Sequence, residues 1–214
     1  MGSNAMTPRA PHVLLPGFLE AGPRDDLLAL LRSRRAEFEA GRLVGGRLDA
    51  GIRNGLALLD LDEAAHALRD RALRELPALA PRLGLPAFTP GEVEVQAAAY
   101  GDGGHYDRHI DTFVGEYAAA ASRVVTIVLY LHVLPKRFGG GALRLFPIGG
   151  DHGPVDVEPE HGLAVAFPSF LAHQVMPVSC SGDEPGDLRY AVNIWIRRQA
   201  PAGHRRDGKL ASVT

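Results

Sequence analysis

Six short runs of strand-forming residues, separated by clusters of glycine and proline, occupy the second half of the chain and constrain its fold most strongly. The runs are EVEVQAAAY (92–100), RVVTIVLYLHV (123–133), GALRLFP (141–147), GLAVAFP (162–168), HQVMPVS (173–179) and RYAVNIWIRR (189–198). This spacing is typical of antiparallel sandwiches and barrels. In the last run, apolar residues alternate with positions that include Arg189, Asn193 and Trp195, so one side is aliphatic and the other is mixed. We therefore expect a β-barrel with a partly polar interior and an aliphatic outer face.

Two helices are predicted ahead of the barrel, where they would cover its aliphatic face. Residues 23–41 open with proline and two aspartates and close on glycine, which are start and stop signals of a helix. Residues 60–84 form the second helix, whose last turns Pro77 should disturb. The expected inward positions are Leu27, Leu28, Leu31 and Phe38 in the first helix and Ala64, Leu68 and Leu76 in the second. The glycine-rich segment 42–59 between them is expected to be a loop with one strand.

Composition and charge predict one cytoplasmic domain over residues 6–214, with a helical part (6–89), a β core (90–198) and a tail (199–214). Residues 1–5 resemble the remnant of an expression tag ahead of Met6. The formal charge of −2 argues against a nucleic-acid partner bound through a broad basic surface. A single cysteine excludes an internal disulfide and indicates a reducing compartment. No hydrophobic run approaches the roughly 18 residues that span a bilayer, so no membrane partner is expected, and nothing predicts the oligomeric state.

The segment GDGGHYDRHID (101–111) gathers potential metal ligands. Asp107, His109 and Asp111 occupy every second position, so in a strand all three would point to the same side. One imidazole and one carboxylate leave a divalent metal under-coordinated, and His173 at the start of HQVMPVS offers a third ligand. Two histidines and one carboxylate leave three positions open on an octahedral ferrous ion, which suits enzymes that activate dioxygen.

Arg189 lies on the mixed side of its strand, together with Asn193 and Trp195, and therefore inside the expected barrel. A buried guanidinium without a counter-ion is costly. Its fork of N–H donors suits a carboxylate bound through both oxygens, so the missing anion is expected to be a ligand. Arg197 and Arg198 are alternatives for this anion site, although their positions fit exposed charges at a strand end.

Five segments of the chain together resemble the Fe(II)/2-oxoglutarate-dependent oxygenases. They are YGDGGHYDRHID, TIVLYL, FGGGALRLFP, AFPSFLAHQVMPVS and RYAVNIWIRR, in the order and spacing of that family. Within the family, the chain is most similar to the prolyl-4-hydroxylase type, which includes the hypoxia-inducible-factor prolyl hydroxylases. The resemblance covers about residues 90–198. It implies a mainly β (α+β) fold, a double-stranded β-helix or cupin-like jelly roll, with the N-terminal helices on the outer face of one sheet.

The resemblance also implies roles for individual residues. His109, Asp111 and His173 would bind Fe(II), and Arg189 would pair with the distal carboxylate of 2-oxoglutarate. Further residues implied at the 2-oxoglutarate pocket are Tyr130, Tyr100, Thr126, Asn193 and Trp195. Arg53, in the segment GIRNG (51–55), and Asp107 are expected near the substrate. O₂ would be the second cosubstrate and ascorbate a candidate reductant. Because related halogenases lack the carboxylate ligand, the presence of Asp111 favours hydroxylation.

Three functions remain open at this point. The resemblance favours hydroxylation of a prolyl residue in a protein or peptide. A free amino acid or another small metabolite is an alternative substrate for the same chemistry. A cupin-like protein that binds metal without redox chemistry is an alternative of another class, but it would need no buried carboxylate-binding arginine.

Overall fold

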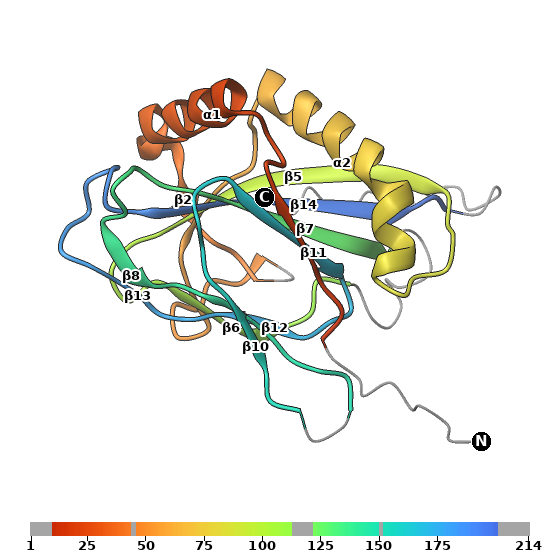
Figure 1. Ribbon diagram of the computed structural model, residues 1–214. Coiled ribbons are helices and arrows are strands. Elements are labelled where there is room, and N and C mark those ends of the chain that lie inside the picture. Colours follow the sequence, from red (N-terminus) through yellow and green to blue (C-terminus); the bar gives the residue numbers. More distant parts are fainter. Residues whose placement is uncertain (1–9, 44–45, 113–121, 150–151, 201–214) are drawn as a thin grey trace.

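The computed structural model describes residues 10–43, 46–112, 122–149 and 152–200 (Figure 1). The suspected tag remnant and most of the expected tail lie outside the described residues. The helices are α1 (Ala21–Ser33), the 3-10 turn η1 (Arg35–Glu37) and α2 (Glu63–Arg82). The strands are β1 (Val13–Pro16), β2 (Glu39–Ala40), β3 (Arg53–Asn54), β4 (Leu56–Leu58), β5 (Pro90–Tyr100), β6 (His105–His109), β7 (Arg123–Leu131), β8 (Phe138–Gly140), β9 (Leu143–Leu145), β10 (Val155–Val157), β11 (Leu163–Pro168), β12 (His173–Val175), β13 (Val178–Cys180) and β14 (Arg189–Arg198).

The strands form two main antiparallel sheets that face each other. The larger sheet has the order β1-β11-β7-β14-β5-β4-β2, and the smaller has the order β10-β9-β12-β6-β3. A two-stranded sheet of β13 and β8 lies beside them. Figure 1 shows α1 and α2 on one side of the larger sheet and the smaller sheet on its other side. This is the expected jelly roll with helices on the outer face of one sheet. Within the described ranges, neither helix is long and apolar enough to cross a membrane.

Two hydrophobic clusters lie on opposite faces of the larger sheet, one under the helices and one in the barrel interior. Tyr190, Val192, Ile194 and Ile196 of β14 belong to the cluster that contains the buried leucines of both helices. Ala191, from the alternate positions of the same strand, belongs to the interior cluster, together with Tyr100 of β5 and Val128 and Tyr130 of β7. The alternation read from the sequence of β14 is therefore confirmed: its aliphatic side faces the helices and its mixed side faces the interior.

The first helix ends earlier than predicted. It stops at Ser33, and Phe38 has the extended conformation at the end of η1. Residues 39–40 then pair with residues 56–57 of β4, so sheet hydrogen bonds replace the predicted last turns of the helix. Phe38 is still buried, because its ring packs against Tyr190 with the ring centroids 6.1 Å apart.

The second helix and the segment before it also differ from the prediction. Helix α2 continues through Pro77 to Arg82, and its buried alanine near the start is Ala65, while the predicted Ala64 is partly buried against the same core. Pro77 lacks the N–H that would bond to the carbonyl oxygen of Leu73, an exposed residue four positions earlier. Segment 42–59 contains β3 and β4, where one strand was expected.

A bulge interrupts the alternation of β6. His173 of β12 lies opposite His109, but Val175, two residues later, lies opposite Tyr106, three residues away from His109. This extra residue breaks the period of two on which the prediction for Asp107 rested. Asp107 is exposed, whereas the Tyr106 ring stacks on the His109 ring. The expectation that Asp107 shares a side with His109 is therefore wrong.

Candidate metal centre and buried arginine

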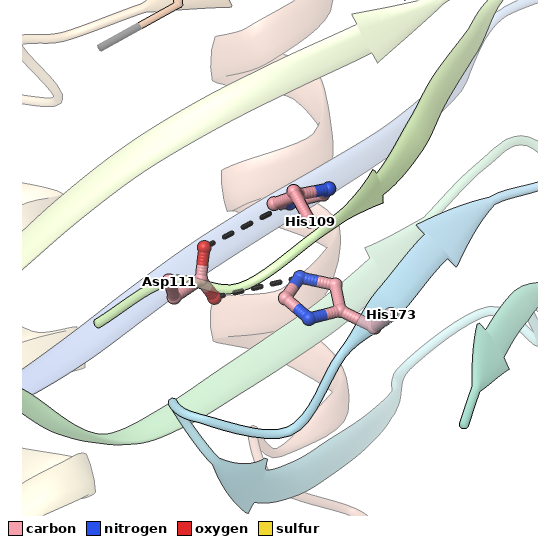
Figure 2. Close-up of side chains that lie close together, drawn as sticks. All are labelled: His109, Asp111 and His173. Atoms are coloured by element: carbon pink, nitrogen blue, oxygen red, sulfur yellow. Dashed lines mark ion pairs between the residues drawn. The ribbon is translucent and has the colours of Figure 1, made fainter. Parts of the chain in front are cut away.

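Three potential metal ligands meet between the smaller sheet and the larger one (Figure 2). His109 is the last residue of β6, and His173 is the first residue of β12, directly opposite it. Asp111 lies just beyond the end of β6. Its Oδ1 is 3.9 Å from Nε2 of His109, and its Oδ2 is 3.5 Å from Nε2 of His173. One ligand atom from each residue lies within 4.8 Å of the others, so the three could hold one metal ion.

Backbone carbonyls orient both imidazole rings toward this point. Nδ1 of His109 lies 2.7 Å from the carbonyl oxygen of Asp107, and Nδ1 of His173 lies 2.9 Å from that of Leu171. Because a carbonyl oxygen only accepts hydrogen bonds, Nδ1 carries the proton in each ring. In the neutral rings, the Nε2 lone pairs then face Asp111. This is the arrangement in which metal-bound histidines are usually held.

Burial and neighbouring charge favour the states that bind metal. Burial, followed by the proximity of His173, lowers the pKa of His109 to about 3, so this imidazole is neutral at physiological pH. Burial alone would raise the pKa of Asp111, but His173, His109 and the Trp195 indole outweigh it and hold that pKa below its ordinary value. Three electron-pair donors thus converge, and at least one carries negative charge. Imidazole nitrogen and carboxylate oxygen are ligands that a divalent iron ion accepts.

A second feature of the interior is a buried cation. The side chain of Arg189, at the start of β14, is 1% exposed, and its Nε donates to the carbonyl oxygen of Gly141 at 2.7 Å. Its Nη1 and Nη2 are buried without a hydrogen-bond partner among the described residues, as is the hydroxyl of Tyr130. The guanidinium carbon lies 5.1 Å from the Tyr130 ring centroid and 5.2 Å from that of Tyr100.

Burial lowers the pKa of Arg189 and raises that of Tyr130. The arginine nevertheless stays charged and the tyrosine stays protonated, so all their free hydrogens are donors. Unpaired donors in a buried place are costly unless a ligand satisfies them. These unpaired donors would suit a carboxylate, and the binding of such an anion at Arg189 stays a prediction.

The alternatives for the anion site lie elsewhere. Nε of Arg197 donates to Glu94 at 2.6 Å, and Glu94 also binds Arg123. Arg198 is exposed. Neither matches the burial and the orphaned donors of Arg189.

Of the other residues predicted at the 2-oxoglutarate pocket, three are buried and one is partly buried. Tyr100, Thr126 and Trp195 are buried. The indole of Trp195 lies close to Asp111 and contributes to its lowered pKa. Asn193, which lies between Arg189 and Trp195 along β14, is partly buried.

The two residues predicted near the substrate lie around β6. The guanidinium of Arg53 lies 4.9 Å from the ring centroid of Tyr106 and donates to the carbonyl oxygen of Arg42. Asp107 contributes its backbone carbonyl to the orientation of His109. Substrate contact by the side chains of Arg53 and Asp107 stays a prediction.

Three contributors were missed by the sequence reasoning. Tyr106 stacks on His109 with the ring centroids 3.6 Å apart. Ser169 is fully buried next to Thr126. Gly141 has a φ of +72°, and a Cβ there would lie 2.7 Å from Cδ of Arg189, so only glycine leaves room for this side chain. The run of three glycines before Ala142 was a visible signal for a close approach of this kind.

Comparison with known proteins agrees with this geometry. Residues 95–197 match the profile of the 2OG-Fe(II) oxygenase superfamily. An uncharacterized PKHD-type hydroxylase of Synechocystis sp. is 32% identical over 139 residues, which cover 62% of this chain and 45% of that protein. The match thus spans less than half of that relative. A PKHD-type hydroxylase of Teredinibacter turnerae is 29% identical over 172 residues, 79% of this chain and 71% of its own.

Solved structures give the same result. A Pseudomonas putida prolyl-4-hydroxylase superposes with a TM-score of 0.67 and 27% identity, over 88% of this chain and 94% of its own. A Trichoplax adhaerens prolyl hydroxylase, solved with a peptide fragment of the hypoxia-inducible-factor oxygen degradation domain, shares the fold with a TM-score of 0.66 and 21% identity, over 87% and 83% of the two chains.

The barrel of this chain, residues 95–197, therefore matches the 2OG-Fe(II) oxygenase superfamily. Within that superfamily, the chain is similar to a prolyl-4-hydroxylase in structure and to PKHD-type hydroxylases in sequence. This family implies Fe(II), 2-oxoglutarate and O₂ as its cofactor and cosubstrates.

Proposed function

We propose that this protein is an Fe(II)- and 2-oxoglutarate-dependent hydroxylase, with the ferrous ion held by His109, Asp111 and His173. One observation carries the proposal: the same barrel interior holds a convergent set of metal ligands and a buried arginine with unpartnered donors. A metal-binding barrel without redox chemistry would need the first feature only. The match of residues 95–197 to the oxygenase superfamily supports the combination.

The residues of the site would have separate roles in binding the metal and 2-oxoglutarate. The two histidines would present neutral Nε2 atoms and Asp111 its negative charge, and the metal would keep open positions for its cosubstrates. Arg189 and Tyr130 would bind the distal carboxylate of 2-oxoglutarate. When bound, iron and 2-oxoglutarate supply the oxidising chemistry, in which O₂ and 2-oxoglutarate give succinate and CO₂ as one oxygen atom enters a substrate C–H bond.

We infer that the substrate is a prolyl residue of a protein or peptide. The likeness to the Pseudomonas putida prolyl-4-hydroxylase, at 27% identity over most of both chains, supports this inference. The PKHD-type relatives support hydroxylation without naming a substrate. The alternative of a free amino acid uses the same metal centre, so the experiment must separate the two substrates.

The test is to incubate the protein with Fe(II), ascorbate, 2-oxoglutarate and either proline-containing peptides or free amino acids. The expected result is a gain of about 16 Da, one oxygen atom, on a prolyl residue of a peptide. The gain should require 2-oxoglutarate and should vanish in His173→Ala. A gain of mass on free amino acids alone would show that the substrate is a free amino acid and not a prolyl residue of a peptide. No 2-oxoglutarate-dependent succinate with any substrate would overturn the proposed activity.

A further inference from the structure

A chain of two buried hydroxyl groups ends on the carboxylate of Asp111. Thr126, in the middle of β7, is 1% exposed, and Ser169, just after β11, is fully buried. Oγ1 of Thr126 lies 2.8 Å from Oδ2 of Asp111 and 2.9 Å from Oγ of Ser169. These contacts place Thr126 against a metal ligand.

The direction of the hydrogen bonds follows from the number of protons. An ionised carboxylate only accepts, so the bond to Asp111 uses the single hydroxyl proton of Thr126. Thr126 can then only accept from Ser169, whose hydroxyl must be the donor. In a buried chain of this kind, each bond polarises the next, and the charge on the carboxylate strengthens the first one.

The backbone of Ser169 holds the same ligand from a second direction. Its carbonyl oxygen accepts the N–H groups of Asp111 at 2.9 Å and of Thr112 at 3.1 Å. Its own N–H donates to the carbonyl oxygen of Val124 on β7 at 3.0 Å. Asp111 lies beyond the end of β6, where no strand ladder holds it. Its main chain and its carboxylate are therefore both tied to Ser169, one directly and one through Thr126.

We propose that Thr126 and Ser169 are positioning residues that hold the Asp111 carboxylate in the orientation needed for metal binding. This inference rests on the proposed function, because it assigns the hydroxyl pair to the metal ligand. The bond from Thr126 prevents free rotation of the carboxylate, which lies 3.5 Å from Nε2 of His173. A carboxylate that cannot rotate keeps the remaining coordination positions open in a constant geometry.

The test measures Co(II) binding to the apoprotein, which needs neither substrate nor turnover. Thr126→Val keeps the shape of the side chain but removes the hydroxyl, and we expect it to weaken Co(II) binding about 10- to 100-fold. Thr126→Ser keeps the hydroxyl, and its affinity should stay close to that of wild type. Ser169→Ala removes only the outer donor and should weaken binding about 2- to 10-fold, as expected for a neutral hydrogen bond.

The visible absorption of bound Co(II) gives a second readout, because it depends on ligand geometry. We expect a changed spectrum in Thr126→Val and a wild-type spectrum in Thr126→Ser. Equal loss of affinity in both variants would overturn the role of the hydroxyl, as would wild-type affinity and spectrum in Thr126→Val. If Thr126→Val does not fold, as judged by circular dichroism, Ser169→Ala against wild type decides the question in the same way.

Two further variants separate this inference from the proposed function. Asp111→Ala and His173→Ala should lose Co(II) binding if the three ligands form the metal centre. If they do so while Thr126→Val binds normally, the positioning role is wrong and the metal centre stands. If Asp111→Ala binds Co(II) as tightly as wild type, the metal centre itself is wrong.

Discussion

Replacing Arg189 with methionine should abolish tight binding of 2-oxoglutarate without destabilising the fold. The guanidinium is 1% exposed and two of its nitrogens have no partner among the described residues, so without an anion it is an uncompensated buried charge. Apolar replacements of buried charges are often neutral or stabilising by about 1–4 kcal/mol. The lost bond to Gly141 reduces this gain. We expect the free energy of unfolding to rise by about 0–2 kcal/mol, or Tm by up to about 8 °C.

The effect on binding should have the opposite sign. Removing one partner of a buried, hydrogen-bonded charge pair costs about 2–5 kcal/mol, which weakens binding roughly 30-fold or more. The assay is thermal unfolding with Mn(II), with and without 2-oxoglutarate. The ligand should raise Tm of the wild type through mass action, but not that of Arg189→Met.

Arg197→Met is the matched control, because it lies on the same strand and its Nε donates to Glu94. It should lower stability but keep the full shift on adding 2-oxoglutarate. The reasoning about Arg189 would be refuted if Arg189→Met were destabilised by more than about 3 kcal/mol and still gained the wild-type shift. The anion site would then lie elsewhere.

Three further substitutions test neighbouring parts of the account. Gly141→Ala should weaken 2-oxoglutarate binding and lower stability by about 1–3 kcal/mol, because its Cβ would collide with Arg189. In the control Gly139→Ala the new Cβ meets only a serine hydroxyl, so equal losses of stability of the two variants in thermal unfolding would contradict this reasoning. Tyr130→Phe should weaken 2-oxoglutarate binding about 2- to 10-fold by removing one hydroxyl donor, as measured by calorimetry, and an unchanged affinity would place the carboxylate away from this ring. Burial opposes the charge of Glu94, but the two arginines that pair with it hold its pKa below the ordinary 4.5, so this charge stabilises the fold above that pH and the stabilisation is lost as the pH falls through the folded pKa. In urea unfolding, the loss of unfolding free energy in Glu94→Gln relative to wild type should therefore shrink between pH 7 and pH 3, and a constant loss would be inconsistent with the lowered pKa.

The site was predictable where residue chemistry and strand alternation decide it. In β14, the period of two separates the aliphatic positions from Arg189, and this pattern depends on local sequence alone. His109, Asp111 and His173 were expected because imidazole and carboxylate are ligands that ferrous iron accepts. The structure brings these three together at the expected place.

Features that depend on distant partners were not predictable in this way. The bulge in β6 arises in its pairing with β12, about 65 positions further along the chain, and it turned Asp107 away from the expected side. Thr126 and Ser169 are separated by 43 positions, and no local pattern links a threonine in one strand to a serine after another. The end of α1 is similar, because pairing of residues 39–40 with β4 overrides the helix signals near Gly41.

The most direct test of the central claim is a crystal structure of the protein with Mn(II) and 2-oxoglutarate, prepared without O₂. We expect the metal bound by Nε2 of His109, Nε2 of His173 and the carboxylate of Asp111, with the distal carboxylate of 2-oxoglutarate on Arg189 and Tyr130. A metal bound through other residues, or a 2-oxoglutarate carboxylate that leaves Arg189 without a partner, would contradict the account.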